Sequence, residues 1–298
     1  MKSQFLVHSP WHPIRFLIRA RVDFILKSLA WQLIACTVAT LSASGQVPVV
    51  VGEQAADYAT RYRATYALSR TLRTEDLAKL RAFLALPPAS TALSEGELAA
   101  LKNNVADALI SHNPLPSGLD DELFAQYRDK PMGDLWRGFV VQKTAELALR
   151  LSEDEQRQAV DFLWARLQEP SGSFAAEAAL GLERLLGKRP ELVDSARLRE
   201  ELIAFVDNPE RPAAARRILL QSLAERDPAA AASRARQFLS GDIPVLLKAS
   251  AIATLGLVGT SSDLQLITPF LTSADLRLSA AADAARHRLS GRNTSTTR

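Results

Sequence analysis

Histidine and cysteine, which bind transition metals and carry much of nucleophilic catalysis, are scarce in this chain of 298 residues. There are four His and one Cys, Cys36, and only His112 and His287 follow residue 45. These two lie far apart, each near the end of a predicted helix, where a capping or solvent-facing role is the simplest interpretation. A zinc site needs three or four ligands, and no His-x-x-x-His, Glu-x-x-His or Cys pair follows residue 45. The sequence therefore predicts no metal site.

Catalytic motifs that can be recognised locally are also missing from the sequence. It contains no Gly-x-Ser-x-Gly elbow and no Gly-rich phosphate loop. Acidic residues cluster at 120–122 and 153–155, but both clusters open predicted helices, where the helix dipole stabilises negative charge. We therefore predict that the protein is not an enzyme, has no catalytic residues and binds no cofactor.

Paired arginines are the stronger candidates for contacts with a partner. They recur through the second half of the chain as Arg197/Arg199, Arg216/Arg217, Arg234/Arg236 and Arg286/Arg288. Residues two apart on a helix point about 200° away from each other, so such a pair divides between two faces. A solvated surface rich in salt bridges is one interpretation, and a basic stripe that meets an acidic partner is the other. We keep Arg199, Arg234 and Arg236 as candidate partner contacts.

Two tryptophans, Trp136 and Trp164, are the large aromatic residues of the middle of the chain. Core packing is one interpretation for both, because an indole buries a large apolar area. An exposed contact anchor is the alternative, since tryptophan is enriched at the energetic centres of interfaces. Both are therefore added to the candidate partner contacts.

The formal net charge of +3 is distributed unevenly. Residues 1–45 hold five basic residues and one acidic residue, a net of +4, which leaves 31 basic and 32 acidic residues, a net of −1, for the remainder. A basic footprint is what nucleic-acid binding requires, and the remainder of the chain lacks one. The charge balance therefore predicts no nucleic-acid partner.

The first 45 residues resemble a targeting segment. Basic residues precede a stretch at 28–52 that has no charged residue, and its most apolar part, 29–41, has the length of a signal-peptide core and is short for a membrane span. Small residues at 43–45 predict a signal cleavage between Gly45 and Gln46.

Two alternatives to cleavage follow from the same segment. Leu33-Ile34-Ala35-Cys36 resembles a lipoprotein box, which predicts lipidation of Cys36, and an uncleaved segment would act as a membrane anchor. Contact with a membrane is expected only through this segment, in either of those two cases.

The remainder of the sequence predicts one helix after another, grouped in pairs. The first helices are expected near 53–72, 95–112, 133–151, 173–187, 211–226, 244–258 and 275–290. The second helices are expected near 74–86, 119–129, 153–168, 194–206, 228–239 and 262–271. Residues 47–51 form the only β-like stretch, and Pro269 is the one proline that lies beyond the first turn of a predicted helix.

Small and apolar residues recur at related positions of the first helices. The recurring position is occupied by Ala64, Val105, Ala145, Ala178, Ala215, Ala251 and Ala281. The spacing lies in the range of 30–45 residues that is typical of stacked helical repeats. The pattern predicts an all-α fold, an α-solenoid of about six to seven helix-pair repeats after the signal-like segment.

The segments 246–259 and 263–271 carry a family resemblance, with an Ala-rich helix that ends in Leu-Gly, a short turn and a Leu-rich second helix. Asp207-Asn208-Pro209, before the Arg/Ala-rich start at 213–217, adds an Asp-Pro turn between repeats. The sequence is similar here to HEAT-like repeat proteins of the short-repeat type found in phycobilisome lyases, most clearly over 174–289 and weakly over 53–151. The resemblance implies a binding or scaffold role, with a few enzymes in the family.

These observations predict three regions: a targeting segment at 1–45, a helical repeat domain at 46–290 and a disordered tail at 291–298. The expected function is that of an exported, non-catalytic scaffold that binds protein partners in the periplasm or cell envelope of a bacterium. The alternatives are a HEAT-like enzyme of the chromophore-lyase or base-excision-glycosylase type, and a nucleic-acid-binding solenoid.

Overall fold

The computed structural model describes residues 45–68, 72–128 and 133–295. Within these ranges the chain is all-α, with fourteen α-helices, four short 3₁₀ helices and no strand. Most of the predicted targeting segment, including Cys36, lies outside the described residues, as do residues 296–298 of the predicted tail. The described residues fall within one compact unit that begins at Ala43.

The helices follow the predicted pairs. The first helices are α3 (Tyr58–Tyr66), α5 (Glu95–Ser111), α7 (Gly133–Ala148), α9 (Ala175–Lys188), α11 (Ala213–Arg226), α13 (Val245–Val258) and α15 (Leu276–Ser295). The second helices are α4 (Thr74–Leu84), α6 (Leu119–Arg128), α8 (Glu153–Gln168), α10 (Ser195–Asp207), α12 (Pro228–Ser240) and α14 (Leu264–Ile267). A short helix, α2 (Gln46–Val51), precedes them.

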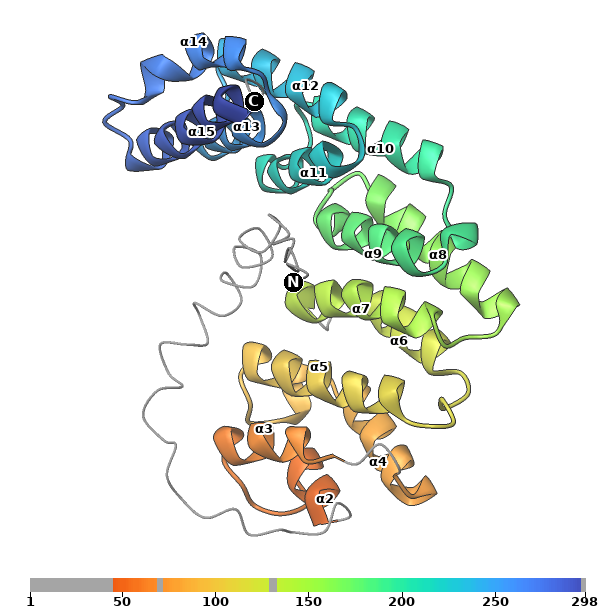
Figure 1. The fold of residues 1–298 in the computed structure, drawn as a ribbon. Coiled ribbons are helices and arrows are strands. Elements are labelled where there is room, and N and C mark those ends of the chain that lie inside the picture. Colours follow the sequence, from red (N-terminus) through yellow and green to blue (C-terminus); the bar gives the residue numbers. More distant parts are fainter. Residues whose placement is uncertain (1–44, 69–71, 129–132, 296–298) are drawn as a thin grey trace, which may run out of the picture. The chain divides into compact units, whose positions relative to one another are not determined.

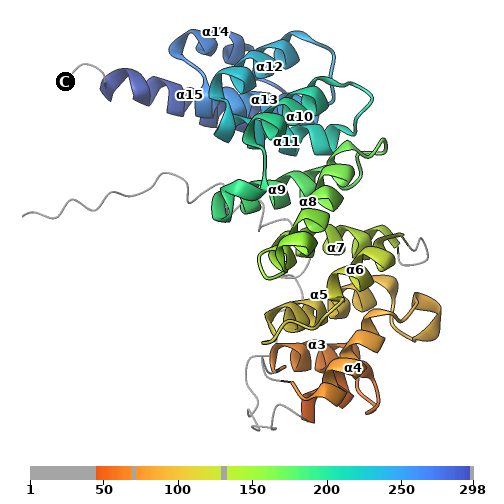
Figure 2. The same cartoon turned by 90° about the vertical axis from the view of Figure 1, so that its right-hand side faces the viewer.

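The helices of unit 43–298 pack in two rows (Figures 1 and 2). Consecutive first helices contact one another from α3 to α15 and form one row. The second helices form the other row, where α8, α10 and α12 each pack against the first helix of their own pair and of the next. The buried apolar side chains form one continuous cluster that extends from Val47 to Leu289.

Helix starts agree with the capping residues in the sequence. Ser94 and Ser152 each form a capping box with the Glu three residues later, before α5 and α8. Asp194 and Asp227 accept backbone hydrogen bonds at the starts of α10 and α12. Because these contacts are local, the predicted boundaries at these positions are confirmed to within a residue or two.

Three local predictions are wrong. Residues 47–51 belong to helix α2, whose Val47 and Val50 are fully buried against α3 and α4, so tertiary packing overrides the β-propensity of valine. The last second helix is broken into α14 and the 3₁₀ turns Ser261–Asp263 and Thr268–Phe270, because Pro269 cannot continue an α-helix. Helix α15 extends to Ser295, five residues into the predicted disordered tail. Its Leu289, in the C-terminal half of the helix, is buried.

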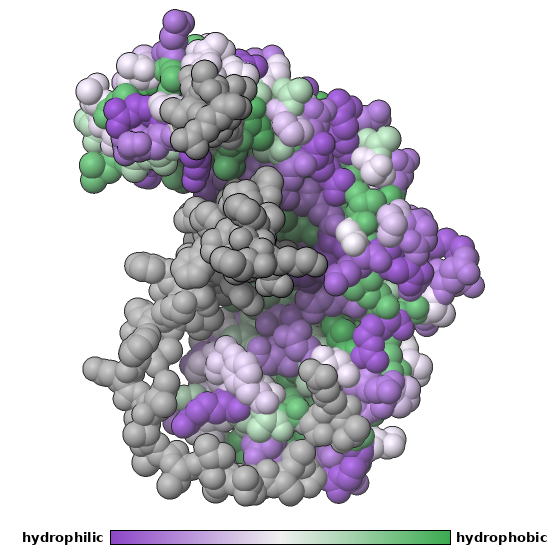
Figure 3. Space-filling model, viewed as in Figure 1, coloured by the Kyte–Doolittle hydropathy of each residue, from purple (hydrophilic) through white to green (hydrophobic). Residues whose placement is uncertain are grey.

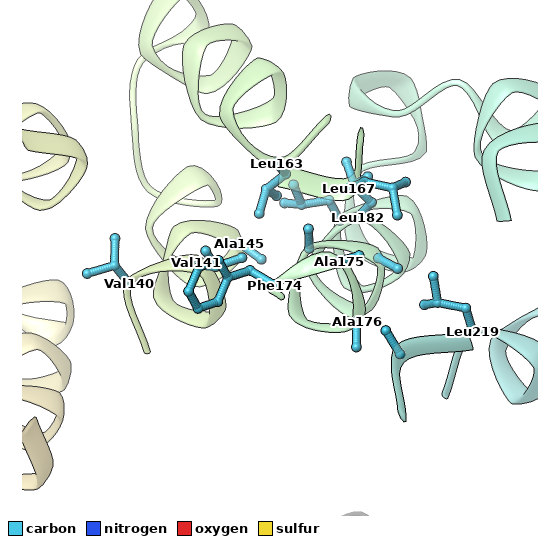
Figure 4. Close-up of a cluster of buried hydrophobic side chains, with 14 of the residues drawn as sticks. Val140, Val141, Ala145, Leu163, Leu167, Phe174, Ala175, Ala176, Leu182 and Leu219 are labelled. Atoms are coloured by element: carbon cyan, nitrogen blue, oxygen red, sulfur yellow. The ribbon is translucent and has the colours of Figure 1, made fainter. Parts of the chain in front are cut away.

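Small residues allow the first helices to approach closely. A Cβ added to Gly256 in α13 would lie 2.8 Å from both Cα and Cβ of Ala285 in α15. A Cβ at Gly181 in α9 would lie 3.4 Å from the Cβ of Ala145 in α7. Figure 4 shows the same pair of helices, where Val141 and Ala145 of α7 lie beside Phe174 and the start of α9. The small-residue pattern therefore marks the contacts between first helices.

Candidate functional site

Trp136 is a core residue. Its side chain is 1% exposed, and its Nε1 donates a hydrogen bond of 3.0 Å to Oε1 of Gln126. The ammonium of Lys102, which is also buried, lies 5.5 Å from the ring centroid. The expectation of a partner contact at Trp136 is corrected, because an indole enclosed on all sides has no surface to offer.

The three candidate arginines tie neighbouring second helices together. Arg199 Nε lies 2.6 Å from Asp227 Oδ2, and Arg234 Nη2 lies 2.9 Å from Asp207 Oδ2. Arg236 Nε donates to Asp263 Oδ1 at 2.6 Å. Each guanidinium is neutralised within the protein, so the basic stripe expected as one alternative is replaced by a row of ion pairs that crosses the helix boundaries.

Asp227 and Asp263 each combine a helix cap with an ion pair. Asp227 accepts from the backbone N–H of Ala230, and this bond, together with Arg199, lowers its pKa. The side chain of Asp263 is 1% exposed, and the hydrogen bond from Arg236 lowers its pKa most. These carboxylates therefore remain ionised and fix the order of the helices rather than face a ligand.

Trp164 lies at the floor of a surface groove between α8 and α10, which we call the α8–α10 groove. The indole is 5% exposed, because the guanidinium of the exposed Arg197 stacks over its ring at 4.2 Å from the centroid. The groove has a volume of about 720 Å³, and Leu151, Val160 and Leu192 complete its apolar lining. Trp164 can therefore contribute to a partner contact only through this groove and beside Arg197.

The rim of the α8–α10 groove carries charges of both signs. Four carboxylates and three guanidinium groups surround it, from Glu153, Asp161, Glu191, Asp194, Arg157, Arg189 and Arg197. Over α8 and α10 the surface is mainly hydrophilic, with small separate apolar patches, on the right-hand side of Figure 3. A small apolar floor within a mixed polar rim is typical of a protein contact that forms and dissociates.

Two arginines and a tyrosine form a cluster that the sequence gave no reason to expect. Arg137 and Arg166 both stack on Tyr127, with guanidinium carbons 4.5 and 4.6 Å from the ring centroid. The Tyr127 hydroxyl donates to Glu169 Oε2 at 2.6 Å, and burial raises the pKa of the phenol. The cluster joins the end of α6 to the start of α7 and the end of α8, which is a structural role.

The titratable groups that could carry chemistry are engaged in packing. Burial lowers the pKa of the Lys102 amine to about 7, yet Lys102 is fully buried and donates to the Leu86 carbonyl at 2.6 Å. His112 caps α5, and its ring nitrogens contact the carbonyl oxygens of Pro114 and Leu72. His287 is exposed beside Asp283, in agreement with the solvent-facing interpretation.

Among the described residues, no group of three or more His, Cys, Asp and Glu side chains is placed to hold a metal ion. Within the same ranges, no helix combines the length and apolar character needed to cross a membrane. Gln46, on one side of the predicted cleavage position, is the buried first residue of α2, and Gly45 precedes it as the N-cap. No family model matches the sequence, and no match to it was found among curated proteins.

Proposed function

We propose that this protein is an exported, non-catalytic α-solenoid of HEAT-like repeats that binds protein partners at the cell envelope. The observation that carries the proposal is the α8–α10 groove, with its indole floor and mixed charged rim. The three arginines predicted as partner contacts, Arg199, Arg234 and Arg236, instead form ion pairs within the protein. A rigid helical array that presents such a groove is suited to binding a polypeptide segment.

Polar contacts along the first helices support the repeat assignment. Asp107 in α5 pairs with Lys143 in α7, Glu146 in α7 with Arg184 in α9, and Glu183 in α9 with Arg226 in α11. The paired residues are separated by 36, 38 and 43 positions. A contact repeated at nearly one spacing is what stacking of equivalent units produces.

The groove is tested by affinity capture with the full chain from envelope extract, followed by identification of the captured protein. Arg197→Glu reverses a charge at the groove and removes the guanidinium that covers Trp164, and it is expected to abolish capture. Arg286→Glu makes the same change at an exposed site on α15 and is expected to preserve it. Capture unaffected by Arg197→Glu would exclude the groove, and enzymatic turnover without any captured partner would contradict the proposed function.

Export is tested separately by mass spectrometry of the mature N-terminus. A chain that begins at Gln46 supports cleavage after Gly45, a lipid mass on Cys36 supports the lipoprotein alternative, and an intact leader supports an anchor. Activity of alkaline phosphatase fused after Gly45 is expected in each of these cases. An inactive fusion would contradict export.

A further inference from the structure

A second groove lies on the row of first helices, between the N-terminal parts of α7 and α9. We call it the α7–α9 groove. It has a volume of about 330 Å³, and its lining includes Leu135, Gly138 and Phe139 from α7 and Phe174 and Glu177 from the start of α9. Leu135 is 49% exposed, and Gly138 leaves bare backbone facing the ring of Phe174. The groove is therefore open at the surface, and it combines these apolar side chains with the polar groups of Asp134, Gln142, Ser173 and Glu177.

Glu177 is the one acidic side chain of this groove that is drawn into the protein. It is the third residue of α9, counted from the N-cap Phe174, and its Oε2 atom is buried with no hydrogen-bond partner. Burial also raises the pKa of its carboxyl group. Glu183, two turns further along α9, is half-buried like Glu177 but is met by Arg226 and Ser222. The Oε2 atom of Glu177 thus lacks a hydrogen-bond donor, while a hydrogen bond from the residue's own backbone N–H only partly offsets the burial of the carboxylate.

No basic side chain lines the groove, so a hydrogen-bond donor for Glu177 Oε2 would have to come from a bound partner. The lining includes two carboxylates, from Asp134 and Glu177. The nearby Arg137 pairs with Asp134, donates to the Tyr127 carbonyl and stacks on Phe174, so it already neutralises Asp134. A cation that entered the groove would therefore meet the carboxylate of Glu177 and the aromatic ring of Phe139.

We propose that the α7–α9 groove binds a lysine or arginine side chain of the protein partner. The apolar stem of that side chain would lie along Leu135 and Phe139, and its charged group would lie beside the Glu177 carboxylate, which matches the two-part chemistry of a long basic side chain. The inference rests on the proposed function, because it assumes a protein partner, and it adds the chemistry by which one residue of that partner is recognised.

The test uses the full chain, methyl-labelled at leucine, and four capped pentapeptides, acetyl-Ala-Ala-Xaa-Ala-Ala-amide. Xaa is lysine, arginine, glutamate or norleucine, the last having the lysine stem without its charge. The lysine and arginine peptides are expected to shift the Leu135 methyl signals, and norleucine to bind at least about tenfold more weakly. Equal binding of norleucine, or no shift with any peptide, would overturn the proposal.

Variants separate the carboxylate from the shape of the groove. Glu177→Gln keeps the size of the side chain and is expected to weaken the lysine peptide at least about tenfold, and Gly138→Leu is expected to block all peptides by filling the groove. Glu146→Gln makes the same chemical change at a carboxylate that already pairs with Arg184, and is expected to leave binding unchanged. Undiminished binding by Glu177→Gln, with its fold confirmed by the methyl spectrum, would contradict the inference.

The peptide test and the capture test fail independently. Loss of peptide binding with continued capture of a partner would remove the α7–α9 groove and leave the proposed function standing. Peptide binding that depends on Glu177, with no partner captured, would leave the groove standing and count against the proposed function.

Discussion

Buried carboxylates of this protein differ in whether they have a cationic partner. Asp263 is fully engaged, with the Arg236 guanidinium on one side and the Thr260 backbone on the other, and its pKa is lowered. Glu177 has a buried oxygen without a partner, and its pKa is raised by desolvation. The two residues therefore have opposite effects on stability as pH changes.

Glu177→Gln is expected to stabilise the free protein at neutral pH. The raised pKa means that the folded state binds the proton more tightly than the unfolded state, so this contribution is present below the ordinary value of 4.5 and lost as pH rises through the folded pKa. Glutamine does not ionise, so the variant does not lose this contribution. Its free energy of unfolding at pH 7 should exceed that of the parent by roughly 1 kcal/mol, the cost of one unpaired buried polar group. Urea unfolding at pH 7 and pH 4 measures it, and the gain should shrink at pH 4. A variant less stable than the parent at pH 7 contradicts this account.

Asp263→Asn is expected to destabilise the protein at neutral pH by about 1–2 kcal/mol, a modest cost because Arg236 is 40% exposed and solvent screens the pair. The lowered pKa means that the contribution of Asp263 is present above the ordinary value of 3.8 and lost as pH falls through the folded pKa. A double-mutant cycle with Arg236→Ala, followed by urea unfolding, isolates the pair. Full additivity at pH 7 would show that the two side chains do not interact.

At the scale of helices, close packing between neighbouring helices depends on small residues, which let the two backbones approach each other. The α13–α15 contact is the tightest example, because the helix backbones meet at Gly256 and Ala285. Helix α13 is covered by α11, α12 and α15, which is consistent with its largely apolar sequence. The close approach makes α13 sensitive to single added atoms.

Gly256→Ala is expected to destabilise the protein by about 1–3 kcal/mol, because the new methyl group would force α13 and α15 apart. The matched control is Gly187→Ala in α9, where an added Cβ meets nothing within 4 Å. The control should be neutral or stabilising by up to about 1 kcal/mol, since alanine favours helix. Thermal unfolding of the two variants checks the contrast, and equal destabilisation would rule out the steric explanation.

The sequence predicted helices wherever the deciding interaction is local. The capping boxes at Ser94 and Ser152 and the prolines between helices set most boundaries to within a few residues. Helix α2 was missed because its valines favour strands and only burial against α3 and α4 decides the outcome. Pro269 marks a position in the predicted helix where an α-helix is disfavoured. The division into α14 and two 3₁₀ turns was not predicted.

The candidate site was less predictable, because it depends on the register between repeats. Arg199, Arg234 and Arg236 were recognised as notable, but their acids lie 27 or 28 positions away on a neighbouring helix pair. Glu177 gave no signal at all, since a glutamate in the first turn of a helix is ordinary. Its significance comes from the groove that it lines together with Phe139 and Phe174, which forms only in the folded chain.

At the scale of unit 43–298, the main contacts of each described helix are with helices close to it in sequence. Stability in such an arrangement is a sum of local terms, and the weakest part opens first. Helices α7, α9 and α11 have neighbours before and after them, whereas the four-residue α14 is flanked by 3₁₀ turns.

Hydrogen exchange is expected to follow this difference. Amides of α7, α9 and α11 should exchange at least about tenfold more slowly than those of α14, because α14 can open without disturbing the central helices. Exchange mass spectrometry with peptide resolution measures the rates. Uniform protection along the chain would instead indicate one cooperative unit and would count against a repeat array.

Burial of α2 also sets an order of events in time. Gln46 is buried and Val47 is fully enclosed, directly after the position where cleavage is proposed. A signal peptidase binds its substrate as an extended segment, so these residues cannot occupy the protease and the core together. The proposed cleavage after Gly45 would therefore have to precede docking of α2, and a chain that folded first would protect the proposed leader from removal.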